Sequence, residues 1–380
     1  MELERSSLSR RERMRRALWR QPVDRLPVQV NLTGAMAARV AARWGCGVDD
    51  LGARFGNHLL RLEPGYPTRL SSDGKVRFDG WGAGWGAETE GYWHAHAPLA
   101  GKADLGTYPW PDPDAPGLLA AAERLLAADG DGHFIVPNFG FALFERAWSL
   151  RGFEALLMEL VAEPVWVEEL LERVVTLQVR LAKRFVGLRV CTPGSAGSSA
   201  AGAGGARHPS DAGEDVGRRG LEAASVRGID GGYFGDDYGA QRSLLFAPRI
   251  WRQMIKPRLA RLFAVFREAG LPVILHSDGD LWPILPDLVD IGLTCLNPVQ
   301  PEVLDHGRLR REFGRHLSFY GGLSTQAVLS GGTPAQVREA VGACVCALAP
   351  DGTGLVLGPS HRMQSDIPVE NVEAMLEAFP

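Results

Sequence analysis

The sequence has no long hydrophobic run, no regular cysteine pattern and little excess of charge of one sign. It contains no stretch of about 18 consecutive apolar residues, so we expect no transmembrane helix. Residues 1–20 carry charges of both signs and lack the apolar centre of a signal peptide. The five cysteines are odd in number and include no Cys-x-x-Cys pair, which argues against a disulfide framework or a zinc knuckle. These absences together indicate a cytoplasmic protein.

The distribution of charge and the lack of a dinucleotide-binding motif limit the kinds of molecule that this protein is expected to bind. The formal net charge is −4 at pH 7, and the Lys and Arg residues are dispersed. No basic stripe indicates nucleic-acid binding, and no acidic run indicates a disordered tail. No Gly-x-Gly-x-x-Gly follows the first expected strand, which excludes the usual dinucleotide-binding motif. We therefore expect a small-molecule substrate, with no nucleic acid and no membrane as partner.

The sequence does contain a series of short apolar runs separated by helical patterns. From residue 229 onward strands and helices alternate regularly, which predicts a parallel sheet. Eight such strands favour an α/β fold of the (β/α)8 or TIM-barrel class, in a single domain over residues 1–380. Strands are predicted at 28–30, 133–136, 229–235, 271–276, 292–296, 316–320 and 354–358, with an eighth near 55–62 or 76–80.

Two segments depart from this alternation. Residues 64–117 are rich in Gly, Pro, Trp and Asp. Linkers rarely carry so many tryptophans, so this segment is predicted to be an ordered excursion over the barrel mouth. Residues 190–228 form a low-complexity stretch rich in Gly, Ala and Ser, without hydrophobic periodicity. Such a stretch buries too little apolar surface to offset its ordering entropy, and we interpret it as an insertion.

Three polar clusters follow predicted strands, at 234–238, 276–280 and 358–361. The carboxyl ends of barrel strands meet at one face, so these clusters should converge there. Strand side chains alternate between faces, and His276 and Asp278 therefore point to the same side while Ser277 points to the other. The pattern excludes a His-Ser-Asp catalytic triad. It leaves His276 and Asp278 either as ligands of one ion or as an acid/base pair.

Other side chains near these strand ends are further candidates. Of the adjacent Asp236 and Asp237, only one can face the barrel axis, while the other caps a turn or helix. His361 lies among small residues after the last strand, where packing does not require a ring. The remaining candidates offer acidic, hydrogen-bonding or aromatic groups for a substrate. They are Asp79, Trp81, Tyr238, Gln241, Asn297 and Gln300.

Six short segments carry a family resemblance: 11–13, 17–18, 22–27, 320–322, 358–361 and 368–371. They resemble the signatures of the uroporphyrinogen decarboxylase superfamily, which includes the haem-pathway decarboxylase and cobalamin-related methyltransferases. The resemblance covers most of the chain outside residues 190–228. It implies a (β/α)8 barrel that is commonly a homodimer.

The two branches of this superfamily differ in their sites. The decarboxylases have an arginine-rich segment just after the first strand, but residues 31–36 here contain no arginine. A substrate with many carboxylates would then lack counter-charges. The methyltransferases hold zinc through a His-x-Cys after one strand and a Cys after the last. His276-x-Asp278 and His361 occupy these places. The resemblance thus implies a divalent metal, zinc or similar, on His276, Asp278 and His361, with Asp236 or Asp237 as a further ligand.

Three functional hypotheses follow. The first is metal-assisted methyl transfer to or from a small molecule, with the methyl group carried by a corrinoid protein as partner. The second is a decarboxylase without metal or other cofactor, which acts on a pyrrolic or other aromatic acid. In it Asp79 or Asp237 stabilises a protonated ring, while His361 and Tyr238 orient the acid. The third is a non-catalytic barrel that binds a small molecule or a corrinoid protein.

Overall fold

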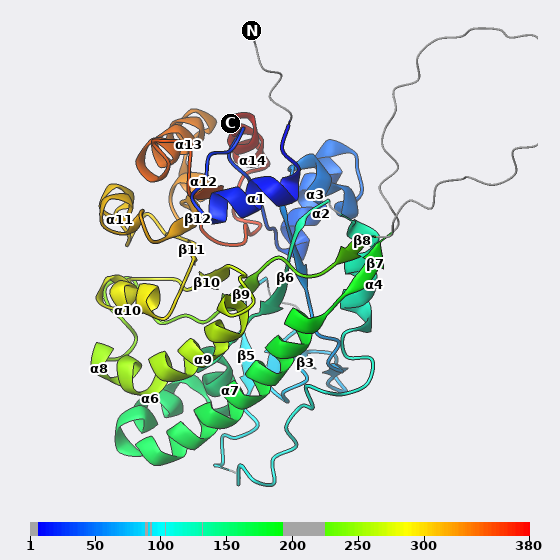
Figure 1. The fold of residues 1–380 in the computed structure, drawn as a ribbon, viewed down its shortest axis with the longest axis vertical. Coiled ribbons are helices and arrows are strands. Elements are labelled where there is room, and N and C mark those ends of the chain that lie inside the picture. Colours follow the sequence, from blue (N-terminus) through cyan, green and yellow to red (C-terminus); the bar gives the residue numbers. More distant parts are fainter. Residues whose placement is uncertain (1–6, 88–89, 92, 103, 131, 193–224) are drawn as a thin grey trace, which may run out of the picture.

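The computed structural model describes residues 7–87, 90, 91, 93–102, 104–130, 132–192 and 225–380. Its central feature is a curled sheet of seven parallel strands (Figure 1). The strands are short and mostly apolar, as is usual where helices cover one face of a sheet and a core fills the other. In sheet order they are β1 (Leu59–Leu62), β6 (Phe134–Phe139), β9 (Gly232–Gly235), β10 (Val273–His276), β11 (Cys295–Asn297), β12 (Ser318–Leu323) and β13 (Leu355–Pro359).

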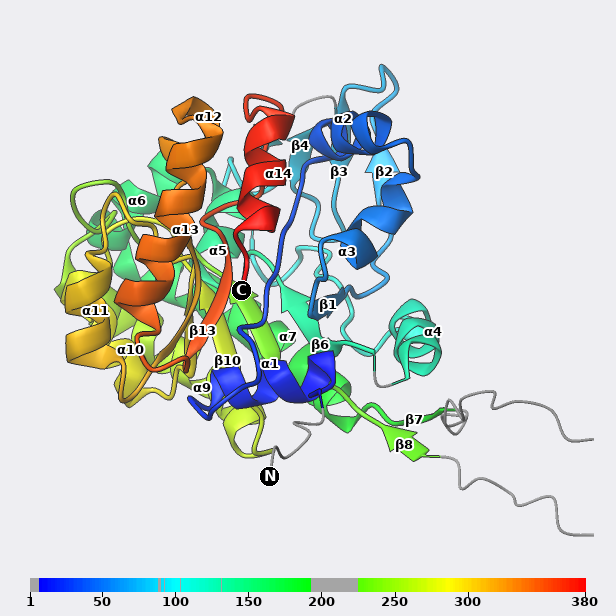
Figure 2. The same cartoon turned by 90° about the horizontal axis from the view of Figure 1, so that it is seen from above.

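Helices surround this sheet (Figure 2). Among them α7 packs against α9, and α13 packs against both α11 and α14. None of the described helices is both long and apolar enough to cross a membrane. The α-helices are α1 (Arg10–Leu18), α2 (Gly34–Trp44), α3 (Leu51–Arg54), α4 (Ala120–Asp129), α5 (Phe144–Arg151), α6 (Phe153–Ala162), α7 (Pro164–Gly187), α8 (Pro248–Ile250), α9 (Lys256–Arg267), α10 (Leu285–Asp290), α11 (His306–Phe313), α12 (Val328–Gly331), α13 (Pro334–Leu348) and α14 (Val369–Glu377). Shorter 3-10 or π turns are η1 (Val48–Asp50), η2 (Trp251–Ile255) and η3 (Trp282–Ile284).

The segment 27–32 lies beside the last strand of the sheet. Val28 forms a parallel bridge with Leu357 of β13. The backbone N–H of Gln29 donates to the Leu357 carbonyl at 3.0 Å, and the Leu357 N–H donates to the Pro27 carbonyl at 2.8 Å. The segment thus extends the sheet beyond β13 as an additional, strand-like part of the barrel wall.

The other edge of this segment contacts the start of β1 through side chains. The Asn57 amide donates to the Val30 carbonyl at 3.0 Å and accepts from the Val30 N–H at 2.8 Å. The Gln29 side-chain oxygen accepts from the backbone N–H groups of His58 and Leu59, at 3.2 and 2.9 Å. Side-chain amides therefore complete the hydrogen bonding where a regular strand pair is missing, and the sheet closes into a barrel.

The predicted barrel is confirmed. The seven strands predicted with definite limits all lie in the barrel wall. Residues 28–30 are counted among them, because they belong to the strand-like segment 27–32 beside β13. The eighth strand, for which two positions were open, is β1 at 59–62. The competing segment becomes β3 (Val76–Phe78) in a separate antiparallel sheet.

That separate sheet gives the excursion 64–117 its regular structure. It contains β2 (Arg69–Leu70), β3, β4 (Gly84–Gly86) and β5 (His94–His96). Glu90 connects the excursion to loops of the barrel mouth, because its carboxylate accepts hydrogen bonds from the hydroxyls of Thr33 and Ser365. The excursion is therefore attached directly to the rim of the barrel.

The two ends of the low-complexity stretch 190–228 also pair with each other. β7 (Val190–Thr192) and β8 (Ser225–Arg227) form a two-stranded antiparallel ribbon. The remainder of the predicted insertion, residues 193–224, lies outside the described residues.

Inward-pointing side chains fill the amino-terminal half of the barrel. Alternate residues of the strands, among them Leu59, Phe134 and Ile274, form an interior cluster with Met14 and Leu18 of α1. Helix α1 therefore covers the amino-terminal end of the barrel, where the strands begin (Figure 1). Open space remains at the carboxyl ends of the strands.

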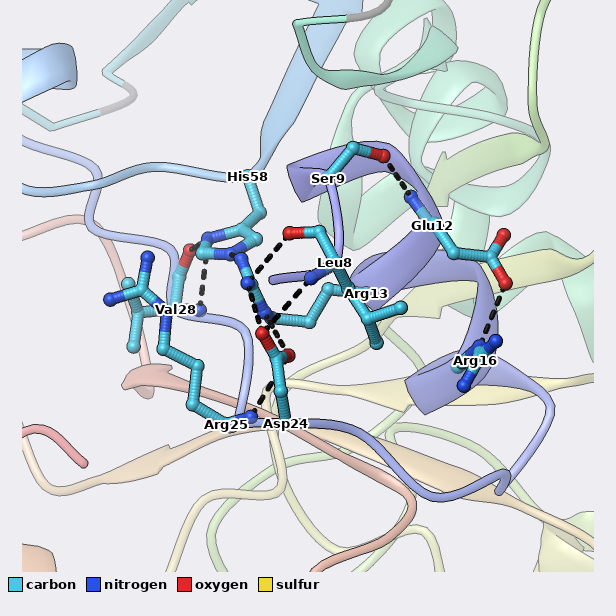
Figure 3. Close-up of polar contacts among 9 residues, drawn as sticks. All are labelled: Leu8, Ser9, Glu12, Arg13, Arg16, Asp24, Arg25, Val28 and His58. Atoms are coloured by element: carbon cyan, nitrogen blue, oxygen red, sulfur yellow. Dashed lines mark hydrogen bonds and ion pairs between the residues drawn. The ribbon is translucent and has the colours of Figure 1, made fainter. Parts of the chain in front are cut away.

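A buried arginine connects α1 to Asp24 and to His58, and His58 contacts Val28 of the segment 27–32 (Figure 3). Arg13 is 1% exposed and donates to both carboxylate oxygens of Asp24, each at 2.7 Å. Its Nη1 also contacts Nε2 of His58 at 3.0 Å. Because a guanidinium can only donate, His58 Nε2 must accept, and Nδ1 carries the proton toward the Val28 carbonyl at 3.2 Å. His58 is therefore held in one neutral form.

We predict that Gly358→Ala destabilises the barrel while Gly342→Ala does not. An added Cβ at Gly358 would overlap the backbone carbonyl oxygen of Gln29, which lies in the segment 27–32. Forcing these backbones apart should lower the free energy of unfolding by about 3 kcal/mol. Gly342 lies within α13 with open space around it, so alanine there should stabilise by about 0.5–1 kcal/mol. Urea unfolding of both variants is the measurement, and equal effects would contradict the closure described here.

We also predict an acid-sensitive contribution from His58. Burial, and secondly the Arg13 charge, lower the pKa of His58 from 6.5 to about 4. Between these values the unfolded chain binds a proton that the folded protein does not, so stability falls as the pH falls through this range. From pH 7.5 to pH 5 the loss should be about 2 kcal/mol. Denaturant unfolding should show a shallower pH dependence for His58→Gln than for the wild type. Parallel slopes would refute the assignment, and the variant of the exposed His316, His316→Asn, should behave as the wild type.

Candidate functional site

A cavity of about 490 Å³ opens at the carboxyl ends of the barrel strands. Parallel strands present every second side chain to the barrel axis, so the last inward residue of each strand faces this cavity. The inward residues that line it are Arg61, Asn138, Tyr233, His276, Asn297 and Tyr320. The volume is in the range of small-molecule sites.

His276 and Asp278 point to the same side, as the alternation predicts. His276 Nε2 lies 3.8 Å from a carboxylate oxygen of Asp278. Ser277 faces away, and its hydroxyl accepts a hydrogen bond from the Tyr238 N–H at 3.0 Å. His361, from the loop after β13, joins the pair: ligand atoms of these three residues lie within 4.8 Å of one another. The structure thus brings together three of the predicted metal ligands.

Asn297 fixes the orientation of the His276 ring. Its Nδ2 donates to the Tyr320 carbonyl at 3.1 Å, so its Oδ1 faces the other way and accepts from the Tyr233 hydroxyl at 2.9 Å. The same oxygen lies 2.7 Å from His276 Nδ1. Nδ1 must therefore carry the proton, which leaves the Nε2 lone pair directed at the cluster.

The cluster offers two imidazoles and one carboxylate, a donor set that suits zinc and similar divalent ions. His276 and Asp278 are partly buried, with 21% and 31% of their side chains exposed. His361 is exposed at the mouth. One side of the cluster is thus built into the barrel, and the other is open to an incoming molecule.

The two adjacent aspartates have different surroundings. Asp236 is fully buried and accepts from the N–H groups of Phe144 and Glu145, at 3.0 and 2.6 Å, and from the Tyr238 hydroxyl at 2.6 Å. Burial raises the pKa of Asp236 to about 6. Asp236 and Tyr238 thus hold the first turn of α5 and do not line the cavity.

Asp237, by contrast, lines the cavity, and its carboxylate accepts a hydrogen bond from the Asp278 N–H at 2.8 Å. Burial raises the pKa of Asp237.

Asp79 and Trp81 lie in the excursion and outside the cavity lining. The Asp79 carboxylate accepts from two backbone N–H groups, at Trp81 and Ala83, and from Trp85 Nε1. It also pairs with Arg146 of α5 at 2.7 Å. Trp81 is 5% exposed and packs beneath the same Arg146. Both residues attach the excursion to α5.

The two glutamines lie in a neighbouring hollow of about 310 Å³, which shares Asp278 and His361 with the cluster. Gln300 donates to Gln241 at 3.1 Å. They therefore lie beside Asp278 and His361.

Glu145 and Arg61 are charged residues of the cavity lining that were not predicted. Glu145 lies in the first turn of α5, and burial beside the Asp237 and Asp236 charges raises its pKa well above the usual range. No local sequence signal marks it, since its position depends on the contact of the first turn of α5 with Asp236, far away in the sequence. Arg61 does have a signal: it is a charged residue within the apolar strand Leu-Leu-Arg-Leu.

Comparisons with known proteins agree with this architecture. Residues 237–379 match the family model "Uroporphyrinogen decarboxylase (URO-D)". Among solved structures, a methyltransferase from Methanosarcina mazei is similar over 98% of this chain and 98% of its own, with a TM-score of 0.65 and 18% identity. A Xaa-Pro dipeptidase with bound methionine aligns over 70% of this chain and 59% of its own at 9% identity, and its TM-score of 0.28 supports no conclusion. A search of curated proteins found no match.

Over residues 237–379 the family match confirms the resemblance to the uroporphyrinogen decarboxylase superfamily, and the structural likeness confirms the barrel fold. Both the family model and the methyltransferase are named for enzymes.

The site geometry predicts the tautomer of His276. Nitrogen-15 NMR of histidine-labelled protein should show the proton on Nδ1, because Asn297 Oδ1 accepts it. Asn297→Leu removes this acceptor and should remove the preference for Nδ1–H. The resonance is assigned by its loss in His276→Gln, and His316 serves as an exposed reference. A wild-type His276 protonated on Nε2 would contradict the described hydrogen-bond network.

Proposed function

Taking the match of residues 237–379 to the uroporphyrinogen decarboxylase family as premise, we propose that this protein is an enzyme that carries out metal-assisted methyl transfer to or from a small molecule. The observation that supports this most is the cluster of His276, Asp278 and His361 at the mouth of the cavity, with His276 oriented by Asn297. A bound divalent ion there would lower the pKa of a thiol or hydroxyl acceptor.

The residues of this chain would each have a defined task. His276, Asp278 and His361 would hold the ion, and Asn297 would keep the Nε2 lone pair of His276 toward it. Glu145 and Asp237 line the same cavity and offer carboxylates for the proton that the acceptor loses. The cavity walls would exclude water from the acceptor.

The methyl donor in this proposal is a methylcorrinoid, carried by a partner protein. The acceptor's lone pair would form the new bond to the methyl carbon, while the carbon–cobalt pair of electrons would remain on cobalt. His361 is exposed at the mouth, where a bulky donor could approach. The shared fold with the methyltransferase from Methanosarcina mazei is consistent with this proposal.

Decarboxylation is the second candidate, and the position of Asp237 favours it. This carboxylate lines the cavity, where it could stabilise a protonated ring, and His361 lies at the same mouth. The family model itself is named for a decarboxylase. Against a porphyrinogen, the guanidinium groups lining the described cavity are those of Arg61 and Arg362, too few for a substrate with many carboxylates.

We predict that metal content depends on the cluster. Protein purified without chelators and dialysed against a slight excess of Zn²⁺ should retain about one equivalent per chain by elemental analysis. His276→Ala and Asp278→Ala should abolish retention, whereas His316→Ala should not. Asn297→Leu should weaken zinc affinity by about 10–100-fold, because it removes the partner that orients His276.

Activity is then tested with methylcobalamin in place of the corrinoid protein. Transfer to a thiol acceptor should release cob(I)alamin, which is followed by its absorbance, and His276→Ala should abolish the release. A metal content that His276→Ala leaves unchanged would refute the metal-assisted proposal. Carbon dioxide release from an aromatic acid without metal would support the decarboxylase instead.

A further inference from the structure

Arg61, on β1, places a positive charge inside the barrel. It follows Leu59 by two positions on β1, and Leu59 belongs to the interior cluster, so both side chains point inward. The Arg61 side chain lines the cavity. Within the described part of the chain it forms no ion pair, whereas the buried Arg13 and Arg146 are paired with Asp24 and Asp79.

The immediate neighbours of Arg61 are aromatic. Its guanidinium carbon lies 3.8 Å from the centroid of the Tyr233 ring. The Tyr320 hydroxyl hydrogen-bonds to the guanidinium and also accepts from the Asn31 amide at 3.3 Å. Arg61 Nε is buried and has no hydrogen-bond partner. A guanidinium has five N–H donors, and these contacts use few of them.

The nearest acid along the strand, Glu63, interacts with Arg61 electrostatically but does not form an ion pair with it. Glu63 lies two residues beyond Arg61, toward the rim, and its carboxylate accepts a hydrogen bond from Asn138 at 2.6 Å. Arg61 is half-buried at the cavity, and its Nε is enclosed. A cation that is partly withdrawn from water without an ion pair is costly to the fold, and an apolar residue would fill the same place at lower cost. Arg61 is therefore best explained by something that it binds.

We infer that Arg61 binds the carboxylate of a small, singly charged substrate. A guanidinium matches a carboxylate with two parallel hydrogen bonds, and its face here is already fixed by Tyr233. One guanidinium among tyrosines and amides balances one negative charge. A phosphate dianion would require further donors such as a second cation at the same depth, and Arg362 lies instead in the loop after β13.

Strand register places this anchor below the metal-ligand cluster. Tyr233, on which Arg61 stacks, is paired with Ile274, and His276 lies two residues further along β10. At about 3.3 Å per residue, the level of Tyr233 and the level of His276 are roughly 7 Å apart along the strand. A substrate held by its carboxylate at Arg61 therefore extends toward the mouth, and its other end reaches His276, Asp278 and His361. This identifies the substrate class for the proposed function as a short acid with its reacting group distant from the carboxylate.

Binding to the metal-free protein tests this inference independently of the proposed function. The probes are benzoate and its neutral isostere benzamide, titrated by calorimetry into protein treated with EDTA. The wild type should bind benzoate at least tenfold more tightly than benzamide. Arg61→Met should reduce the difference to less than twofold, Arg61→Lys should keep an intermediate preference, and Arg16→Met, on the surface of α1, should behave as the wild type.

Thermal stability distinguishes a binding role from a structural one. Arg61→Met should melt at the same or a higher temperature than the wild type, because it removes an unpaired charge. Equal wild-type affinities for benzoate and benzamide, or a preference that survives in Arg61→Met, would overturn the inference. So would a markedly lower melting temperature for Arg61→Met together with unchanged affinities in Arg61→Lys. A result in which zinc is not retained but benzoate binding depends on Arg61 would reject the proposed function alone.

Discussion

The structure depends on the closure of its sheet between β13 and β1. On one side the segment 27–32 is joined to β13 by backbone hydrogen bonds, as in any parallel pair. On the other side one backbone hydrogen bond, from the His58 N–H to the Val28 carbonyl, is supplemented by the side-chain amides of Asn57 and Gln29. If the sheet were open between β13 and β1, unpaired backbone groups would be exposed and the two walls of the cavity would be separated. Asn31, in the segment 27–32, and Ser360, directly after β13, both line that cavity. The cavity wall is therefore complete only in the closed barrel.

Strand-level alternation explains why much of this site could be predicted from the sequence. Knowing that His276 and Asp278 share a face requires only the period of a strand, and their meeting with His361 requires only that barrel strands end at one face. The same reasoning could not choose between Asp236 and Asp237, because the turn after β9 leaves the strand geometry. The choice depends on α5, whose first N–H groups occupy Asp236.

Other side chains have roles that no local pattern reveals. Asp79 follows a short apolar run and resembles a catalytic acid in sequence, but its carboxylate is held by four donors of the excursion and α5. Glu145 looks like an ordinary residue of a first helical turn, yet it lines the cavity. In both cases the deciding contact joins segments far apart in the chain. Arg61 was recognisable as a charge in an apolar strand, but its lack of an ion pair could be seen only once the strands were assembled.

The pairing of the segment 27–32 with β13 also has a consequence for the order in which parts of the chain can fold. Val28 and Leu357 are adjacent in space but separated by most of the chain. A ribosome delivers the amino-terminal segment first, and this segment has no strand to pair with on that side until β13 has emerged. Contacts of such long sequence separation form late, because the intervening chain must first be brought together. During synthesis the polar groups of the segment 27–32 therefore remain exposed to other chains for longer than those of any strand that pairs with a close neighbour in sequence.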